Sequence, residues 1–131
     1  MILASGCFDG LHAGHVAYLE AAHALCEHEE VLVVAVAPDA YIVKTKHRSA
    51  CWTQAERLQT VAALTVVDAT IAQSSTSVAQ TIRDFRPRIF VKGSDWQDRL
   101  PEAILVACTQ TGTAIAFVET PGRHTSEAQT G

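Results

Sequence analysis

The chain has 131 residues, of which 48% are hydrophobic and 18% charged, and its formal net charge is −4. This size and composition are typical of one globular domain that buries its own core. A net negative chain lacks the basic face that nucleic-acid binding requires, and no apolar run is long enough to span a membrane. No secretory signal is visible at the start, so we expect a cytoplasmic protein.

The first element is an apolar strand over residues 1–6. A glycine-rich turn follows, Ser5-Gly-Cys-Phe-Asp-Gly-Leu-His-Ala-Gly-His15, and apolar residues at helical spacing then predict a helix from about residue 14 to 27. The other strands are expected at 31–36, 65–70, 88–92 and 114–118. Thr53 with Glu56 forms a capping box for a second helix.

Two more helices are expected in the second half of the chain. Ser77 with Gln80 indicates the start of one, and Pro87 ends it. Pro101 suits the first turn of the other, and Gly112 suits its end. The basic run 44–48 between the second strand and second helix is either a solvated loop or a local anion site. The four cysteines contain no C-x-x-C pair, so we expect reduced thiols that mostly fill the core.

Strands and helices therefore alternate, which predicts an α/β fold. We expect a Rossmann-like three-layer α/β/α domain over residues 1–126, with a five-stranded parallel sheet in the order 3-2-1-4-5 and a short tail at 127–131. In such a sheet a ligand lies beyond the carboxyl ends of the strands, at the switch point between strands one and four.

The glycine-rich turn has the composition of a phosphate-binding loop. Gly6, Gly10 and Gly14 let the backbone turn sharply, and a helix start attracts an anion. His12 and His15 lie three residues apart at that helix start, close enough for two imidazoles to contact one phosphoryl group. The turn lacks the Lys and Ser or Thr of a Walker loop and the spacing of a dinucleotide fingerprint. A metal site on Cys7 and the histidines, or a purely structural turn, are the alternatives.

The segment 6–15 resembles the G-x-F-D-x-x-H-x-G-H signature of the nucleotidylyltransferase superfamily. Val91-Lys-Gly-Ser-Asp-Trp96 is similar to the V-x-G-x-D-W or K-G-G-D-Y segment of its glycerol-3-phosphate cytidylyltransferases and sugar-phosphate adenylyltransferases. Glu119-Thr-Pro-Gly-Arg-His-Thr-Ser126 resembles their R-T-E-G-I-S-T-T segment without its leading Arg. The resemblance covers nearly the whole chain.

The resemblance implies that an acceptor phosphate attacks the α-phosphate of a nucleoside triphosphate and that pyrophosphate leaves. The catalytic residues would be His12, His15, Lys44 and Lys46. The nucleotide-binding residues would be Gly6, Cys7, Phe8, Gly14, Lys92, Gly93, Asp95, Trp96, Arg123, Thr125 and Ser126. The acceptor-binding residues would be Asp9, Asp39 and Arg57. Asp9 orients a histidine, meets a cation or merely bonds its own turn. Mg²⁺ is expected with the nucleotide.

The substrates that the resemblance favours are CTP and a small polyol phosphate such as glycerol 3-phosphate. The alternatives are an adenylyltransferase that uses ATP and a sugar phosphate, and a nucleotide-binding module without turnover. Trp96 favours the cytidylyl branch, whereas Lys92 before Gly93 favours the adenylyl branch. A homodimer is expected because related enzymes are often dimers, and neither nucleic acid nor a membrane is expected as a partner.

Overall fold

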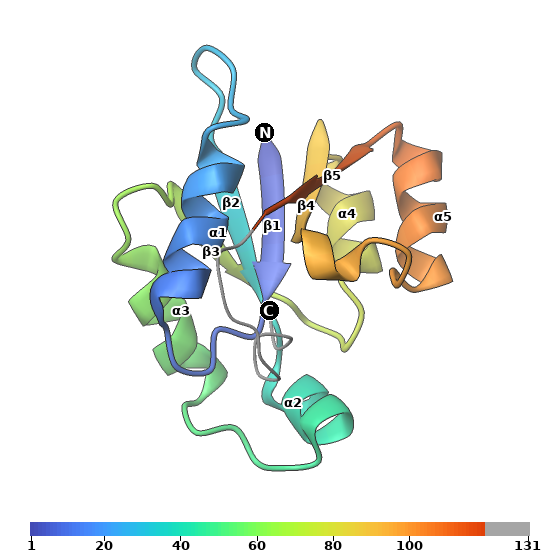
Figure 1. Cartoon of the computed structure of the whole chain (residues 1–131). Helices are drawn as coiled ribbons and strands as arrows, with labels where there is room; N and C mark the ends of the chain where they lie inside the picture. The colour runs from blue at the N-terminus through green and yellow to red at the C-terminus, as the bar shows by residue number, and fades with distance from the viewer. Residues whose placement is uncertain (120–131) are drawn as a thin grey trace.

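The computed structural model describes residues 1–119 and contains a five-stranded, all-parallel sheet in the order β3-β2-β1-β4-β5 (Figure 1). The strands are β1 (Ile2–Gly6), β2 (Leu32–Val36), β3 (Ala69–Ala72), β4 (Ile89–Gly93) and β5 (Ala114–Val118). The helices are α1 (Ala13–His23), α2 (Asp39–Lys46), α3 (Gln54–Ala62), α4 (Ala79–Phe85), α5 (Glu102–Thr111) and the 3-10 turn η1 (Ser94–Trp96). The predicted fold class and strand order are confirmed.

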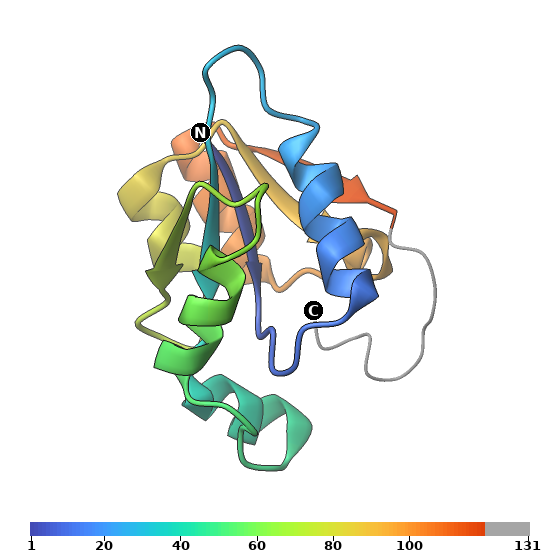
Figure 2. The same ribbon diagram turned by 90° about the vertical axis from the view of Figure 1, so that its left-hand side faces the viewer.

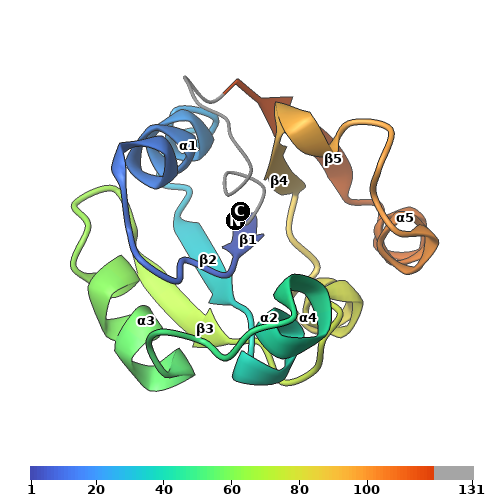
Figure 3. The same cartoon turned by 60° about the horizontal axis from the view of Figure 1, so that its bottom comes forward.

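Helices cover both faces of the sheet, and Figure 3 shows α1 and α3 on one side with α4 and α5 on the other. Because side chains alternate along a strand, neighbouring residues of β1 enter different cores. Ile2 and Ala4 pack in the cluster beneath α1 and α3, whereas Leu3 packs in the cluster beneath α4 and α5. The central strands β1 and β2 are buried along their whole length. The sequence of β2 is apolar throughout, as a strand covered on both faces requires, and β1 has one polar residue, the buried Ser5.

The helix ends mostly follow the predicted signals. Thr53 and Glu56 form the expected capping box of α3, and the Ser77 hydroxyl accepts from the Ala79 amide at the start of α4. Gly112 ends α5 with a φ of 70°, a left-handed conformation that suits glycine. Pro101 lies one residue before α5. The first helix ends at His23, shorter than predicted.

Two predictions about local structure were wrong. The third strand was expected at 65–70 but spans Ala69–Ala72, because Val66 and Val67 pack into the core beneath α1 and α3 before strand pairing begins. The basic run was left open as a solvated loop or a local anion site, with no helix predicted there, yet Lys44 and Lys46 lie on helix α2. That helix is short, has no side-chain cap and buries only Ile42 fully, so its sequence carries little helical pattern.

Candidate active site

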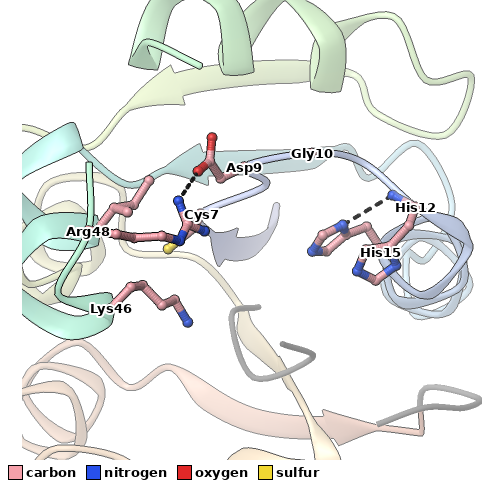
Figure 4. Close-up of a pocket in the computed structure, with 8 residues that line it drawn as sticks. Cys7, Asp9, Gly10, His12, His15, Lys46 and Arg48 are labelled. Carbon is pink, nitrogen blue, oxygen red and sulfur yellow. Dashed lines mark hydrogen bonds and ion pairs between the residues drawn. The ribbon is translucent and has the colours of Figure 1, made fainter. Parts of the chain in front are cut away.

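A pocket of about 90 Å³ opens at the carboxyl end of the sheet (Figure 4). Figure 2 shows that the loop after β1 and helix α2 both lie at this end, beyond the strand arrowheads. The lining residues are Cys7, Asp9, Gly10, His12, His15, Ile42, Lys46 and Arg48. The glycine-rich loop and the basic run therefore face each other across one cavity, at the predicted switch point of the sheet.

The two histidines cap helix α1 with their own side chains. The His12 Nδ1 accepts a hydrogen bond from the Gly14 amide at 3.0 Å, and the His15 Nδ1 accepts from the His12 amide at 3.3 Å. A neutral imidazole that accepts at Nδ1 carries its proton at Nε2. The capping geometry thus fixes both tautomers and makes each Nε2–H a donor. The rings stack, with centroids 3.9 Å apart.

His15 is held in one orientation by its surroundings. It is 6% exposed, and the Phe8 ring meets it edge to face at a centroid distance of 5.3 Å. Burial, and secondarily the neighbouring His12, lower the pKa of His15 to about 4, so the ring is neutral at pH 7. Its buried Nε2 has no hydrogen-bond partner within residues 1–119. A buried donor without a partner in a pocket wall is suited to receive an anionic ligand.

The backbone of the loop turns at Gly10, one of the three glycines expected, and at Phe8, which was not expected. Positive φ values occur at Phe8 (53°) and Gly10 (104°), so a buried aromatic residue makes one of the turns. Gly14 serves another purpose: a Cβ there would lie 2.9 Å from Cε1 of His12. Glycine at position 14 is therefore required so that the His12 ring can fold back onto the helix start.

The opposite wall of the pocket comes from α2 and the segment after it. Lys46 lines the cavity, and Figure 4 shows its side chain on the side away from the two imidazoles. Lys44 is exposed and is not among the lining residues. The structure thus distinguishes the two predicted lysines. Arg48 also lines the pocket, and sequence reasoning did not assign it a role; only its membership of the basic run pointed to it.

Asp9 joins the two walls of the pocket. Its carboxylate accepts from Arg48 Nη1 at 2.8 Å and from the backbone amides of Cys51 and Trp52 at 2.9 and 3.0 Å. Partial burial would raise the pKa of Asp9, but these hydrogen bonds outweigh it and lower the pKa. Of the predicted alternatives, Asp9 meets a cation, and that cation is a guanidinium of the protein.

Arg57 is buried in a hydrogen-bond network, and Asp39 is its half-exposed partner. Arg57 is 1% exposed, and its guanidinium donates to the carbonyls of Cys7, Ala37 and Trp52 and to Asp39 Oδ1. A contact between Arg57 and a substrate would require these bonds to break, whereas the expected acceptor contact of Asp39 stays a prediction. The side chain instead ties the ends of β1 and β2 to the segment before α3, and Asp39 is its ion-pair partner at 2.6 Å.

Tyr18 separates β1 from β4 at the switch point. The β1–β4 pairing stops at Ala4 and Val91, whereas β1 pairs with β2 through Gly6. Beyond that point the buried Tyr18 hydroxyl accepts a hydrogen bond from the Ser5 amide at 3.3 Å and donates one to the Val91 carbonyl at 2.8 Å. A side chain from α1 thus replaces the backbone ladder and opens the sheet next to the pocket.

The β4 segment lies at the same end of the sheet. Lys92 is buried on β4, its Nζ donates to the Ser5 carbonyl at 3.3 Å, and it lies 4.6 Å from the centroid of the Trp96 ring. Burial lowers the pKa of Lys92 to about 8. Gly93 ends β4, and Asp95 is exposed on η1. The Trp96 Nε1 is buried and has no hydrogen-bond partner in the described part of the chain.

Some predicted features fall outside the structure or find no counterpart in it. Arg123, Thr125 and Ser126, like the predicted boundary at 126, lie outside the described residues. Within residues 1–119 no cluster of three metal-ligating side chains occurs, so the alternative metal site on Cys7 and the histidines has no support there. No helix in that part of the chain is long and apolar enough to cross a membrane.

Comparison with known proteins gives consistent matches. A family model described as cytidylyltransferase-like matches residues 3–120. The bifunctional protein HldE from Coxiella burnetii is 40% identical over 99 residues, which cover 74% of this chain and 20% of that protein. HldE from Halorhodospira halophila is 40% identical over 105 residues, covering 79% and 21%. The chain therefore spans about a fifth of the length of these relatives.

A solved structure resembles almost the whole chain. It is a lipopolysaccharide core biosynthesis protein from Thermoplasma volcanium, with a TM-score of 0.73 and 27% sequence identity. The alignment covers 94% of this chain and 97% of that one. The likeness thus extends over both the sheet and the loops at its carboxyl end.

Proposed function

The chain belongs to the cytidylyltransferase-like family, and we propose that it is a nucleotidyltransferase that joins a nucleoside triphosphate to a phosphorylated acceptor. The family and the HldE relatives support nucleotidyltransferase activity. One structural observation carries the proposal. Two imidazoles at a helix N-terminus accept hydrogen bonds at Nδ1 and keep Nε2 for a ligand, beside a pocket whose other wall holds Lys46 and Arg48.

In this reaction an oxygen of the acceptor phosphate forms a bond to the α-phosphorus, and the bond from that phosphorus to the β-phosphate oxygen breaks. The acceptor phosphate is already ionised, so little proton transfer is needed, and catalysis rests on positioning and charge stabilisation. His12 and His15 donate to the triphosphate between its α- and β-phosphates. Lys46 neutralises charge from the opposite wall. Lys92 and Trp96 lie at the end of β4 and just after it, outside this pocket, and are proposed to contact the nucleotide from there.

A sugar phosphate and ATP are the substrates that we favour. The solved relative from Thermoplasma volcanium is a protein of lipopolysaccharide core biosynthesis, and a polysaccharide core is assembled from sugars. Lys92 before Gly93 matches the K-G-G-D-Y form of sugar-phosphate adenylyltransferases. The second candidate is CTP with glycerol 3-phosphate, which Trp96 favours because the cytidylyltransferases carry a tryptophan there.

Mg²⁺ is proposed to accompany the nucleotide and to neutralise charge on its phosphates. The nearest carboxylate, Asp9, has its two oxygens occupied by one guanidinium and two amides. The described residues contain no group of three side chains that could hold a metal ion, so the phosphate oxygens themselves would hold it. A homodimer stays a prediction.

The decisive experiment measures pyrophosphate release with ATP, CTP, GTP and UTP against a panel of sugar 1-phosphates and glycerol 3-phosphate. We expect the highest kcat/KM with ATP and a sugar phosphate. Turnover only with CTP and glycerol 3-phosphate would favour the second candidate. Nucleotide binding by calorimetry without pyrophosphate release from any pair would contradict the enzyme and favour a binding module.

A further inference from the structure

Arg48 combines partial exposure with a fixed geometry. Its side chain is 44% exposed, yet Nη1 donates to Asp9 Oδ2 at 2.8 Å and to the Ser49 carbonyl at 3.0 Å. The hydrogen bond to Asp9 raises the pKa of Arg48, so the guanidinium keeps its charge throughout the neutral range. A long surface arginine ordinarily samples many rotamers, whereas this one is anchored at a single nitrogen.

The anchoring leaves the rest of the guanidinium available. The hydrogen bonds that Arg48 makes within residues 1–119 all use Nη1, so Nη2 and Nε still have donor capacity. Figure 4 shows Arg48 and Lys46 on one side of the pocket and both imidazoles on the other.

We propose that Arg48 binds the phosphate of the acceptor and that Asp9 is the positioning residue that aims its guanidinium into the pocket. This inference rests on the proposed nucleotidyl transfer, whose acceptor it locates. Arginine presents a planar pair of N–H donors that matches two phosphate oxygens, which a lysine cannot do. A sugar phosphate or polyol phosphate carries this group.

The position of Arg48 favours the acceptor over the nucleotide. The histidines at the start of α1 are the proposed ligands of the triphosphate, and Arg48 reaches the same cavity from the segment after α2. Attack on the α-phosphorus requires two phosphate groups side by side, with entering and leaving oxygens in line. A cation across the pocket from the histidines can hold the entering phosphate and reduce the repulsion between the two anions.

The first test separates the two Michaelis constants. Arg48→Met should raise the KM for the acceptor by about 10- to 100-fold, as expected for a lost charged hydrogen bond, and change the KM for the nucleotide far less. Arg48→Lys should restore only part of the loss. The matched control is Arg86→Met, which removes an exposed arginine at the end of α4 that leads into β4. Equal acceptor KM values in the Arg48→Met and Arg86→Met variants would overturn the proposal, as would an equal rise in nucleotide KM.

The second test addresses Asp9 through a double-mutant cycle. If Asp9 acts through Arg48, Asp9→Asn raises the acceptor KM in the wild type but adds little in the Arg48→Met background. Additive effects would contradict the positioning role. Should Asp9→Asn fail to fold, as judged by thermal unfolding, the Arg48→Lys variant still tests the site.

Failure of the proposed function can be distinguished from failure of this inference. If the wild type turns over no pair of substrates, glucose 1-phosphate and inorganic phosphate are titrated into the protein by calorimetry. Binding that is weaker in Arg48→Met than in Arg86→Met would support a phosphate site at Arg48 without any reaction. Equal phosphate binding by both variants, or no phosphate binding by the wild type, would exclude a phosphate site at Arg48.

Discussion

The two ends of the parallel sheet differ in whether their polar groups have partners within the described protein. At the amino end, Glu30 accepts from Arg88 through Nε and Nη2 and lies 3.3 Å from the Met1 amine, while Arg88 also donates to the Leu25 carbonyl. At the carboxyl end, a cavity opens, and the His15 Nε2 lies buried without a partner within residues 1–119. At the amino end the charged groups satisfy one another, whereas at the carboxyl end a buried donor that no described protein group satisfies marks the site.

The difference extends to the backbone. The amino ends of β1 and β4 follow the regular ladder, and Arg88 donates its amide to the Met1 carbonyl. At the carboxyl ends the ladder is replaced by Tyr18, and the chain turns through a left-handed Phe8. A residue with a Cβ in the left-handed backbone conformation costs about 1–2 kcal/mol, and the packing around the buried Phe8 must offset this cost. Strain and missing pairing therefore coincide with the cavity.

The largest effect is expected when a hydrogen-bond donor at the carboxyl end is removed while the helix cap is kept. His12→Asn supplies a preferred N-cap residue but no Nε2–H. We expect turnover to fall by about 10²–10³, as for a lost charge-stabilising donor, with an unchanged melting temperature. Steady-state pyrophosphate release measures the turnover, and scanning calorimetry measures the melting temperature. A His12→Asn variant with full activity would remove His12 from the mechanism.

The second prediction concerns pH. His15 has a pKa of about 4 in the folded protein against an ordinary 6.5, so the unfolded chain binds a proton first as the pH falls. Stability is therefore full above pH 6.5 and decreases toward pH 4, by about 3 kcal/mol at a cost of about 1.36 kcal/mol for each pKa unit.

Urea unfolding of the wild type and of His15→Gln at several pH values measures this loss. Glutamine can still accept from the capped amide, as in an ordinary capping box, but it does not titrate. The variant should lose much less stability than the wild type between pH 6.5 and 4. Parallel curves would show that His15 is not protonated on unfolding in this range.

The sequence predicts the fold better than it predicts the hydrogen-bond partners of the site residues. Alternating apolar strands and helix caps are local patterns, so the fold class could be inferred, and so could the position of His12 and His15 at one helix start. The partners of Arg57 and Asp9 could not. The carbonyls of Cys7 and Ala37 meet Arg57 only after β1, β2 and α3 have packed, and no spacing in the chain encodes that meeting.

Helix α2 illustrates the same limit. Only Ile42 is fully buried on it, so tertiary packing rather than sequence pattern forms the helix that brings Lys46 to the pocket and leaves Lys44 in solvent. Residue type alone cannot distinguish two lysines two positions apart, whereas a helix turns them to different sides.

A third prediction tests the opening between β1 and β4. Tyr18→Phe removes the hydroxyl that bridges Ser5 and Val91, and with it a hydrogen-bond partner of two buried backbone groups. We expect a loss of about 1–3 kcal/mol in unfolding free energy. The control is Tyr41→Phe, because the Tyr41 hydroxyl makes no hydrogen bond within residues 1–119. Equal stability of the two variants would mean that the strands close without Tyr18.

The smallest effect is expected at the amino end, where Glu30→Gln weakens the ion pairs with Arg88 and Met1. Hydrogen bonds from Arg88 lower the pKa of Glu30 to about 2, so its contribution to stability is present above the ordinary value of 4.5 and disappears as the pH falls toward 2. Exposed ion pairs contribute little, so the variant should show a slight loss of stability at pH 7 and wild-type turnover. The difference between variant and wild type should vanish only below pH 4.5, whereas that of the His15 variant changes above pH 4. A Glu30→Gln protein with reduced kcat at pH 7 would show that the amino end is coupled to the reaction, and the contrast between the two ends would then fail.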